Sequence, residues 1–132
     1  MKYLLDTHII LWVLANDKNL TDDVKRIIDD RNSEIYYSTI SPWEVEIKHL
    51  KRKDFKLSGD QLTFLCDQNG LNSIQIKNNH VSELKNIKIK EDINHNDPFD
   101  KMLLAQAMSE NMIFVTHDRK FSAYDSKNIL LV

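Results

Sequence analysis

The sequence is short of glycine, proline and cysteine, with two, two and one of them in 132 residues. Glycine normally makes up about 7% of a protein, and the glycine-rich loops that cradle phosphates need several glycines close together. Gly59 and Gly70 cannot build such a loop, which excludes nucleotide binding through a P-loop or a GxGxxG turn. The single Cys66 excludes an internal disulfide and a cysteine-based zinc cluster, and it suits a reducing compartment.

Long hydrophobic runs and linkers are also missing. The longest apolar stretch, Ile9 to Ala15, is far shorter than the roughly 20 residues that span a membrane. The N-terminus lacks the basic flank, apolar run and cleavage site of a signal peptide. No repeat or Pro/Gly/Ser-rich linker divides the chain, so we expect a single domain over residues 1–132, located in the cytoplasm and not in a membrane. The net charge of −2 does not by itself indicate a nucleic-acid partner.

Strand-like and helix-like segments alternate along the chain. Apolar and β-branched runs predict strands at 3–5, 35–39, 73–76, 112–115 and 128–132. Helical spacing predicts helices at 8–15, 22–30, 41–51, 58–69, 79–84 and 97–108, and a short one at 119–123. This alternation implies right-handed crossovers, and therefore an α/β fold with a parallel sheet of about five strands covered on both faces.

Acidic residues follow or adjoin several of the predicted strands. Asp6 ends the first strand, and Asp118 lies just beyond the strand at 112–115. Glu44 is in the first turn of the helix after the second strand. Asp97 and Asp100 open the helix that leads into the strand before Asp118, and their spacing places them on one helix face. Because ligands of open α/β sheets bind beyond the carboxyl ends of the strands, we expect these carboxylates to share one crevice.

Carboxylates so close together need a counter-charge to stay ionised. A hard divalent cation such as Mg²⁺ provides it, and it typically takes one or two protein carboxylates plus waters. Such a cation lowers the pKa of a bound water, offsets charge on a phosphoryl group and aligns the attack. The acids therefore predict metal-dependent hydrolysis of a phosphodiester bond.

Each acid also has a structural interpretation. In the segment SPWE at 41–44, Ser41 is predicted to be the N-cap of a helix and Glu44 its capping-box acid. In the segment DPFD at 97–100, the alternative to metal binding is that Asp97 is simply the N-cap of a helix and Asp100 an acid of its first turn. Asp118 can cap the next helix, and Asp6 can be an ordinary loop residue.

Basic, histidine and aromatic side chains provide weaker signals. Lys51 and Arg52 belong to a basic cluster that either binds RNA phosphates or complements the dipole at a helix end. His8, His95 and His117 each lie within two positions of a proposed acid and are candidates to donate to a phosphate or a 2′-hydroxyl. Trp12, Trp43 and Cys66 are predicted to be core or interface residues, and the helix at 9–14 is apolar on all sides, so another chain can cover part of it.

Four segments carry a resemblance to a known family. They are YLLDTHIILW at 3–12, SPWEVEIKHLK at 41–51, HNDPFDKMLLAQA at 95–107 and VTHDRKFSAY at 115–124. In this order and spacing, the chain resembles the PIN-domain ribonucleases, and specifically the VapC-type toxins of bacterial type II toxin–antitoxin pairs with an HxDPFD motif. The resemblance covers nearly the whole length. It implies a three-layer α/β/α sandwich and Mg²⁺- or Mn²⁺-dependent endonuclease activity on RNA.

The resemblance also implies roles for individual residues. Asp6 and Asp100 look like direct metal ligands, and Glu44 like the helix-borne glutamate that binds the metal or positions water. Asp118 matches the fourth, more variable acid, and Asp97 is an additional acid that is either a ligand or a cap. Lys101 stands where the subgroup usually has arginine, and is a candidate RNA contact without the bidentate fork. The family implies a cognate antitoxin, a homodimer, and products with a 3′-hydroxyl and a 5′-phosphate.

Three alternative interpretations compete with this one. A haloacid-dehalogenase-like phosphatase also begins with a strand-end aspartate but needs a second one two residues later, where this chain has His8. A receiver domain needs an acidic pair after the first strand, which Asp6-Thr7-His8 does not supply. A catalytically silent PIN module, or one that is not a toxin, would bind RNA or protein only, and the complete acid set argues against the silent form.

Overall fold

The computed structural model describes residues 1–90 and 97–132. The strands are β1 (Lys2–Leu5), β2 (Glu34–Ser38), β3 (Asn72–Ile74), β4 (Ile113–Thr116) and β5 (Ile129–Leu131). The helices are α1 (Thr7–Ala15), α2 (Asp22–Asp29), α3 (Ile40–Lys51), α4 (Gly59–Gln68), α5 (Asn78–Glu83) and α6 (Pro98–Ser109), with short 3-10 helices η1 (Leu84–Asn86) and η2 (Arg119–Ala123). None of the described helices is long and apolar enough to cross a membrane.

All five strands form one parallel sheet in the order β3-β2-β1-β4-β5. The chain starts at the centre with β1, builds outward through β2 and β3, and then crosses to the other side for β4 and β5. The direction of building therefore reverses between β1 and β4, which makes the carboxyl ends of these two strands the topological switch point. The predicted parallel α/β sheet is confirmed.

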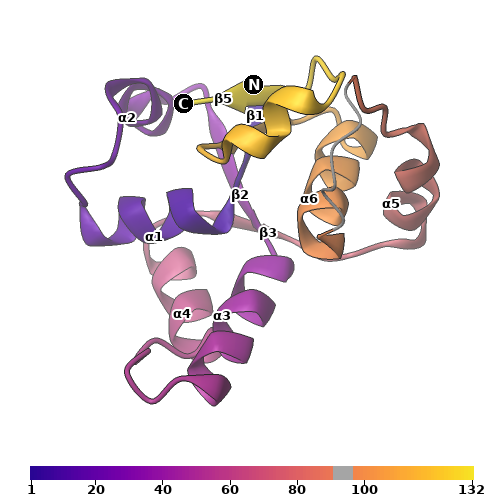
Figure 1. The fold of residues 1–132 in the computed structure, drawn as a ribbon. Helices are drawn as coiled ribbons and strands as arrows, with labels where there is room; N and C mark the ends of the chain where they lie inside the picture. Colours follow the sequence, from indigo (N-terminus) through magenta and orange to yellow (C-terminus); the bar gives the residue numbers. More distant parts are fainter. Residues whose placement is uncertain (91–96) are drawn as a thin grey trace.

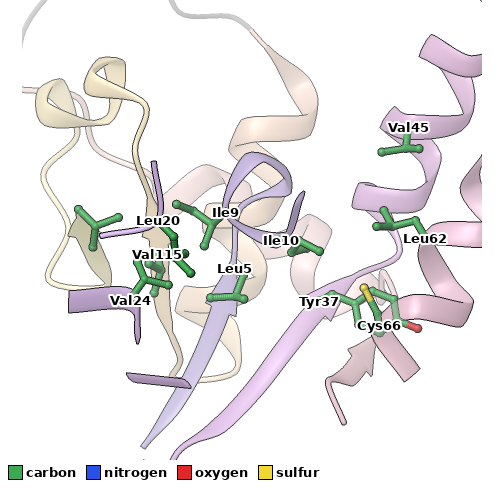
Figure 2. Close-up of a cluster of buried hydrophobic side chains, with 11 residues drawn as sticks. Leu5, Ile9, Ile10, Leu20, Val24, Tyr37, Val45, Leu62, Cys66 and Val115 are labelled. Carbon is green, nitrogen blue, oxygen red and sulfur yellow. The ribbon is translucent and has the colours of Figure 1, made fainter. Parts of the chain in front are cut away.

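Helices cover both faces of the sheet. Successive residues of a strand point to opposite sides, so apolar side chains emerge on both faces and both need a covering layer. On one face, Leu5 and Val115 belong to a buried cluster that includes Ile9 and Ile10 of α1 and Cys66 of α4 (Figure 2). On the other face, a second cluster combines strand residues with α6 and η2; its members include Leu4, Phe114, Leu103, Leu104 and Phe121. Figure 1 shows the resulting layers, with α1 and α2 on one side and α6 and α5 on the other.

The apolar helix α1 is only partly covered within the isolated chain. Ile9 and Ile10 are fully buried, whereas residues 11–14 are half-buried. Cys66 is fully buried, as predicted for a core residue, and burial raises the pKa of its thiol to about 12.

Two boundaries differ from those that the sequence predicts. Helix α3 begins at Ile40, and its N-cap Thr39 makes no side-chain capping bond, so the predicted Ser41–Glu44 capping box is wrong. Both side chains instead meet Thr7 of α1, so tertiary hydrogen bonds prevail over the local capping pattern. Strand β3 ends at Ile74, short of the predicted end, and the next carbonyl, of Gln75, accepts a bond from Gln106 of α6.

Helix α4 starts against α3 at a position that only glycine fits. A Cβ atom on Gly59 would lie 2.7 Å from the Pro42 carbonyl oxygen and 3.2 Å from the Glu46 Cβ. The Gly59 N–H also donates to Glu46 Oε1 at 3.1 Å, which fixes the spacing of the two helices. We therefore expect Gly59→Ala to lower the free energy of unfolding by about 1–3 kcal/mol in urea titrations.

Gly70 provides the control for this substitution. It has a φ of +77°, and a Cβ there would contact nothing within 4 Å. Asparagine tolerates this left-handed conformation, so Gly70→Asn should cost less than about 1 kcal/mol. If Gly59→Ala and the wild type are equally stable, α4 does not approach α3 closely enough at this position to exclude a Cβ atom.

Candidate active site

Asp6 lies at the switch point, between the end of β1 and the start of α1. Its main-chain N–H donates to the Val115 carbonyl at 2.9 Å, and its Oδ1 accepts from the Thr7 N–H at 2.8 Å, which makes it the N-cap of α1. Its Oδ2 accepts from the Thr116 hydroxyl at 2.6 Å. The side chain is only 7% exposed. Two donors orient the carboxylate rigidly, while an ionised carboxylate has about four lone-pair sites for further ligands.

Glu44 is connected to Asp6 through Thr7, whose main-chain N–H binds Asp6 and whose hydroxyl binds Glu44. Thr7 Oγ1 donates to Glu44 Oε1 at 2.9 Å and lies 2.9 Å from Ser41 Oγ. This connection joins the start of α1 to the first turns of α3, so Glu44 faces the strand-end aspartate. Thr7 and Ser41 are parts of the candidate site that the sequence did not indicate. The only sequence signal for Thr7 was its hydroxyl directly after a strand-end acid.

Asp118 is connected to Asp6 through a second hydroxyl, that of Thr116 at the end of β4. The Asp118 N–H donates to Thr116 Oγ1 at 3.1 Å, and this oxygen in turn donates to Asp6. The Asp118 carboxylate accepts from the Lys120 N–H at 3.0 Å and so caps η2. The capping interpretation is therefore confirmed, and the same residue lies beside the site. Thr116 was also missed from the sequence.

Asp97 and Asp100 lie at the start of α6. Asp97 Oδ1 accepts from the N–H groups of Phe99 at 2.9 Å and Asp100 at 3.4 Å, which confirms its role as N-cap. Asp97 is exposed and Asp100 half-buried. The negative charges of both raise the pKa of Glu44, so both lie on the same side of the protein as the site. Whether Asp97 also binds a metal stays a prediction.

Two of the carboxylates have raised pKa values, because of burial and of the negative charges near them. Burial, the largest cause, raises the pKa of Glu44 to about 7, and the charges of Asp6, Asp100 and Asp97 add to it, against the opposing bond from Thr7. Burial also raises the pKa of Asp6, and Asp118 adds a smaller contribution, while the hydrogen bonds to Asp6 oppose the shift. Charge repulsion thus links the predicted acids in pairs, Glu44 with Asp6, Asp100 and Asp97, and Asp6 with Asp118.

This group fits a hard divalent cation. Its donors are carboxylate oxygens, which Mg²⁺ and Mn²⁺ prefer. Within residues 1–90 and 97–132, no three His, Cys, Asp or Glu side chains are close enough to form a ready-made cage. Mg²⁺ keeps several waters and takes only one or two protein carboxylates, so an open site around Asp6 and Glu44, with Asp100 nearby, matches its requirements. A cation there would favour the ionised form of both carboxylates, against the burial and the repulsion that raise their pKa values.

Two of the predicted substrate residues lie beside this group. His8, in the first turn of α1, and His117, directly after β4, line a cavity together with Asp6, Trp12 and Asp118. His117 is also in ring contact with Trp12, their centroids 5.3 Å apart.

The other predicted substrate residues that the structure describes do not line this cavity. Lys101 follows Asp100 in α6 and is half-buried. Lys51 is exposed at the far end of α3, where the helical rise puts it roughly 10 Å from Glu44 along the axis. Arg52 follows it and pairs with Asp54 at 3.2 Å. The structure thus does not bring Lys51 and Arg52 next to the carboxylates, and their contact with RNA stays a prediction. His95 lies outside the described residues.

Trp43 does not lie in the core of the isolated chain, and its place in an interface with another chain stays a prediction. It is 50% exposed, and its ring meets that of Phe99 edge-on, with centroids 4.7 Å apart. Trp12 is half-buried. Both tryptophans lie between Asp6 and Glu44 in the sequence, Trp12 in α1 and Trp43 directly before Glu44 in α3.

The fold and the site together define the class of protein: an α/β protein with a parallel sheet and several acidic side chains at its switch point, where a divalent cation can bind. Residues 3–127 match the sequence model of the PIN domain, so the chain belongs to the PIN-domain family. The family resemblance is confirmed, and the phosphatase and receiver alternatives lose their support. No functionally curated protein matches the chain significantly in sequence.

Several solved structures share the fold over nearly the whole chain. A chain of VapBC2 from Rickettsia felis, bound to a DNA fragment from its promoter, matches with a TM-score of 0.69 and 19% identity, covering 100% of this chain and 98% of the other. A chain of DNA-bound VapBC from Salmonella typhimurium gives 0.68 and 18%, with 98% and 97% covered. VapBC-1 from nontypeable Haemophilus influenzae gives 0.63 and 18%, with 91% and 89% covered. At these identities the likeness establishes the three-layer fold.

Proposed function

We propose that this protein is a metal-dependent endoribonuclease of the VapC type, acting as the toxin of a type II toxin–antitoxin pair. The observation that carries the proposal is the buried Asp6 carboxylate at the switch point of a PIN fold, joined to Glu44 through the N–H and hydroxyl of Thr7. The similarity to VapBC structures supports the toxin role. The site of action would be the cytoplasm.

In this proposal, each acid has a task set by its place. Asp6 and Asp100 bind Mg²⁺ or Mn²⁺, and Glu44 either joins them or accepts the proton of the attacking water. The cation, when bound, activates water and offsets charge on the phosphoryl group. The main-chain N–H of Asp118 binds the Thr116 hydroxyl that orients the Asp6 carboxylate, and the Asp118 carboxylate would act on the cation through water or at a second metal site. Water attacks phosphorus and the 3′-oxygen leaves with a proton, giving a 3′-hydroxyl and a 5′-phosphate.

Removal of the cation tests this function directly. We expect the purified chain to cleave RNA in Mg²⁺ and to lose at least about 100-fold of that rate in EDTA, because the carboxylates alone repel the phosphate. Excess Mg²⁺ or Mn²⁺ should restore cleavage. An Asp6→Asn preparation, purified in parallel, measures any contaminating ribonuclease. Cleavage that resists EDTA and is absent from that control preparation would rule out the metal mechanism.

We also propose a cognate antitoxin and a homodimer as partners. The isolated chain exposes large apolar side chains on the α3–α4 hairpin, with Leu50 75% and Phe64 62% exposed. Next to Phe64 lies an open apolar cavity of about 590 Å³ that Leu57 and Leu65 help to line. Exposed apolar surface of this kind is typical of a protein that binds a partner.

The toxin role predicts a result in cells. Expression of the chain alone should stop growth, and co-expression of the small open reading frame next to its gene should restore growth and yield a complex that purifies as one species. The matched control expresses the same reading frame with a stop codon at its start. If the intact neighbour neither binds the chain nor restores growth, the toxin role is wrong while nuclease activity remains testable in vitro.

A further inference from the structure

A cavity of about 270 Å³ opens beside the carboxylates, and the proposed reaction gives no role to three of its five lining residues. Its lining residues are Asp6, His8, Trp12, His117 and Asp118. His8 and Trp12 are four residues apart on α1 and so lie on one face of that helix. His117 and Asp118 come from the segment after β4. The cavity is therefore bounded by both sides of the switch point.

The wall of this cavity is aromatic. The rings of Trp12 and His117 meet edge-on at an interplanar angle of 65° and a centroid distance of 5.3 Å. His117 Nδ1 contacts the main-chain oxygen of Val132, an acceptor, so Nδ1 donates this bond and the Nε2 side of the ring can form a further hydrogen bond. The wall thus combines π-faces with a hydrogen-bonding ring nitrogen, the two features by which proteins hold an unstacked base.

The charge of the cavity argues against a phosphate as its occupant. Two of its five lining residues are aspartates, and no lysine or arginine of the described residues lines it. An anion would be repelled, whereas a neutral base with N–H donors would not. Asp6 and Asp118 belong to both the cavity and the carboxylate group, so a nucleotide whose phosphate reaches the carboxylates has its base within reach of Trp12 and His117.

We propose that this cavity is a nucleobase subsite, which binds one base next to the scissile phosphate between Trp12, His8 and His117. The inference rests on the proposed ribonuclease function and adds the part of the RNA that the enzyme recognises here. It makes Trp12 and His117 specificity-determining residues, since stacking holds any base and a hydrogen bond to the His117 ring distinguishes one base edge from another.

Neutral nucleosides test the subsite without the metal and without cleavage. The chain has two tryptophans, so in Trp43→Phe the only indole N–H signal in a nitrogen-15 correlation spectrum is that of Trp12. We expect adenosine, guanosine, cytidine or uridine to shift this signal saturably in EDTA, and ribose to leave it unmoved. His117→Ala should weaken binding of the best nucleoside about 5- to 100-fold, the range expected for loss of one stacking partner.

Two further variants separate a base-binding wall from a general structural effect. His117→Phe retains an aromatic face and should keep binding within a few-fold of the parent, whereas Phe64→Ala removes an exposed ring of α4 outside the cavity and should change nothing. If ribose and the nucleosides shift the signal equally, if no nucleoside shifts it, or if His117→Ala binds like the parent, the subsite is wrong.

The outcome is independent of the cleavage assay. Nucleoside binding that depends on His117, with RNA cleavage unaffected by Asp6→Asn, would retain the subsite and reject the catalytic assignment. Loss of cleavage in Asp6→Asn, with no nucleoside binding, would do the opposite.

Discussion

Asp6→Asn should reduce RNA cleavage at saturating Mg²⁺ by at least about 100-fold, more than the 10- to 100-fold typical of residues that only support a metal ligand. The substitution removes the most buried charge of the acidic group, at 7% exposure. Asparagine is an equally good N-cap, so it can still accept the Thr7 N–H bond that starts α1. The loss would therefore reflect chemistry and not an unfolded helix. Initial rates on a labelled RNA measure it.

Asp22→Asn is the matched control, since Asp22 is an exposed acid in the first turn of α2. It should leave cleavage within about twofold of the wild type, as is usual for surface positions. Growth inhibition should follow the same order in cells, with only Asp6→Asn harmless. If the two variants cleave RNA equally well, Asp6 is not a metal ligand and the site must lie elsewhere.

The sequence locates Asp6 and Asp118 correctly because their position depends on short-range information. An apolar strand followed by an acid is visible in ten residues, and the topology of a parallel α/β sheet then brings strand ends to one edge. No local sequence pattern predicts the hydrogen bonds of the Thr7 hydroxyl, because its partners Ser41 and Glu44 are 34 and 37 positions away. Contacts of such separation depend on how α3 packs against α1.

The error at Ser41 has the same origin. A serine followed by proline and glutamate is a sound capping signature, but capping competes with other hydrogen bonds that become available only after folding. At Asp97 the same kind of signature is correct, and the N–H groups of Phe99 and Asp100 are bound as predicted. The cavity wall between Trp12 and His117 was equally invisible, because it joins positions more than a hundred residues apart.

Glu44→Gln should make the metal-free protein more stable at pH 8 while lowering cleavage by about 100-fold or more. Glu44 has a pKa of about 7 in the folded chain, against an ordinary 4.5, chiefly because of burial. Since the folded pKa is the higher one, the native state binds the proton more tightly than the unfolded state. The resulting stability is complete below about pH 4.5 and is lost as pH rises through about 7.

The size of this effect must allow for the solvent that Glu44 still contacts. The full shift would overstate it, and we expect about 1–2 kcal/mol between pH 5 and pH 8. Glutamine cannot ionise, so Glu44→Gln should keep that stability at pH 8. Asp6, whose pKa is also raised, contributes in the same direction in both proteins. Urea titrations in EDTA at the two pH values measure the difference.

At pH 8, a divalent cation should make the wild type the more stable protein and Glu44→Gln the less stable one, the reverse of the order in EDTA. Bound at the site, it favours the ionised carboxylates and should stabilise the wild type at pH 8 more than Glu44→Gln, because the variant has lost one of the charges that attract it. The same ion that supports cleavage would thus offset the electrostatic cost of the empty acidic group, as expected where function requires like charges to be held together. If Mg²⁺ stabilises both proteins equally, or the variant is no more stable in EDTA at pH 8, then Glu44 does not share the cation with Asp6.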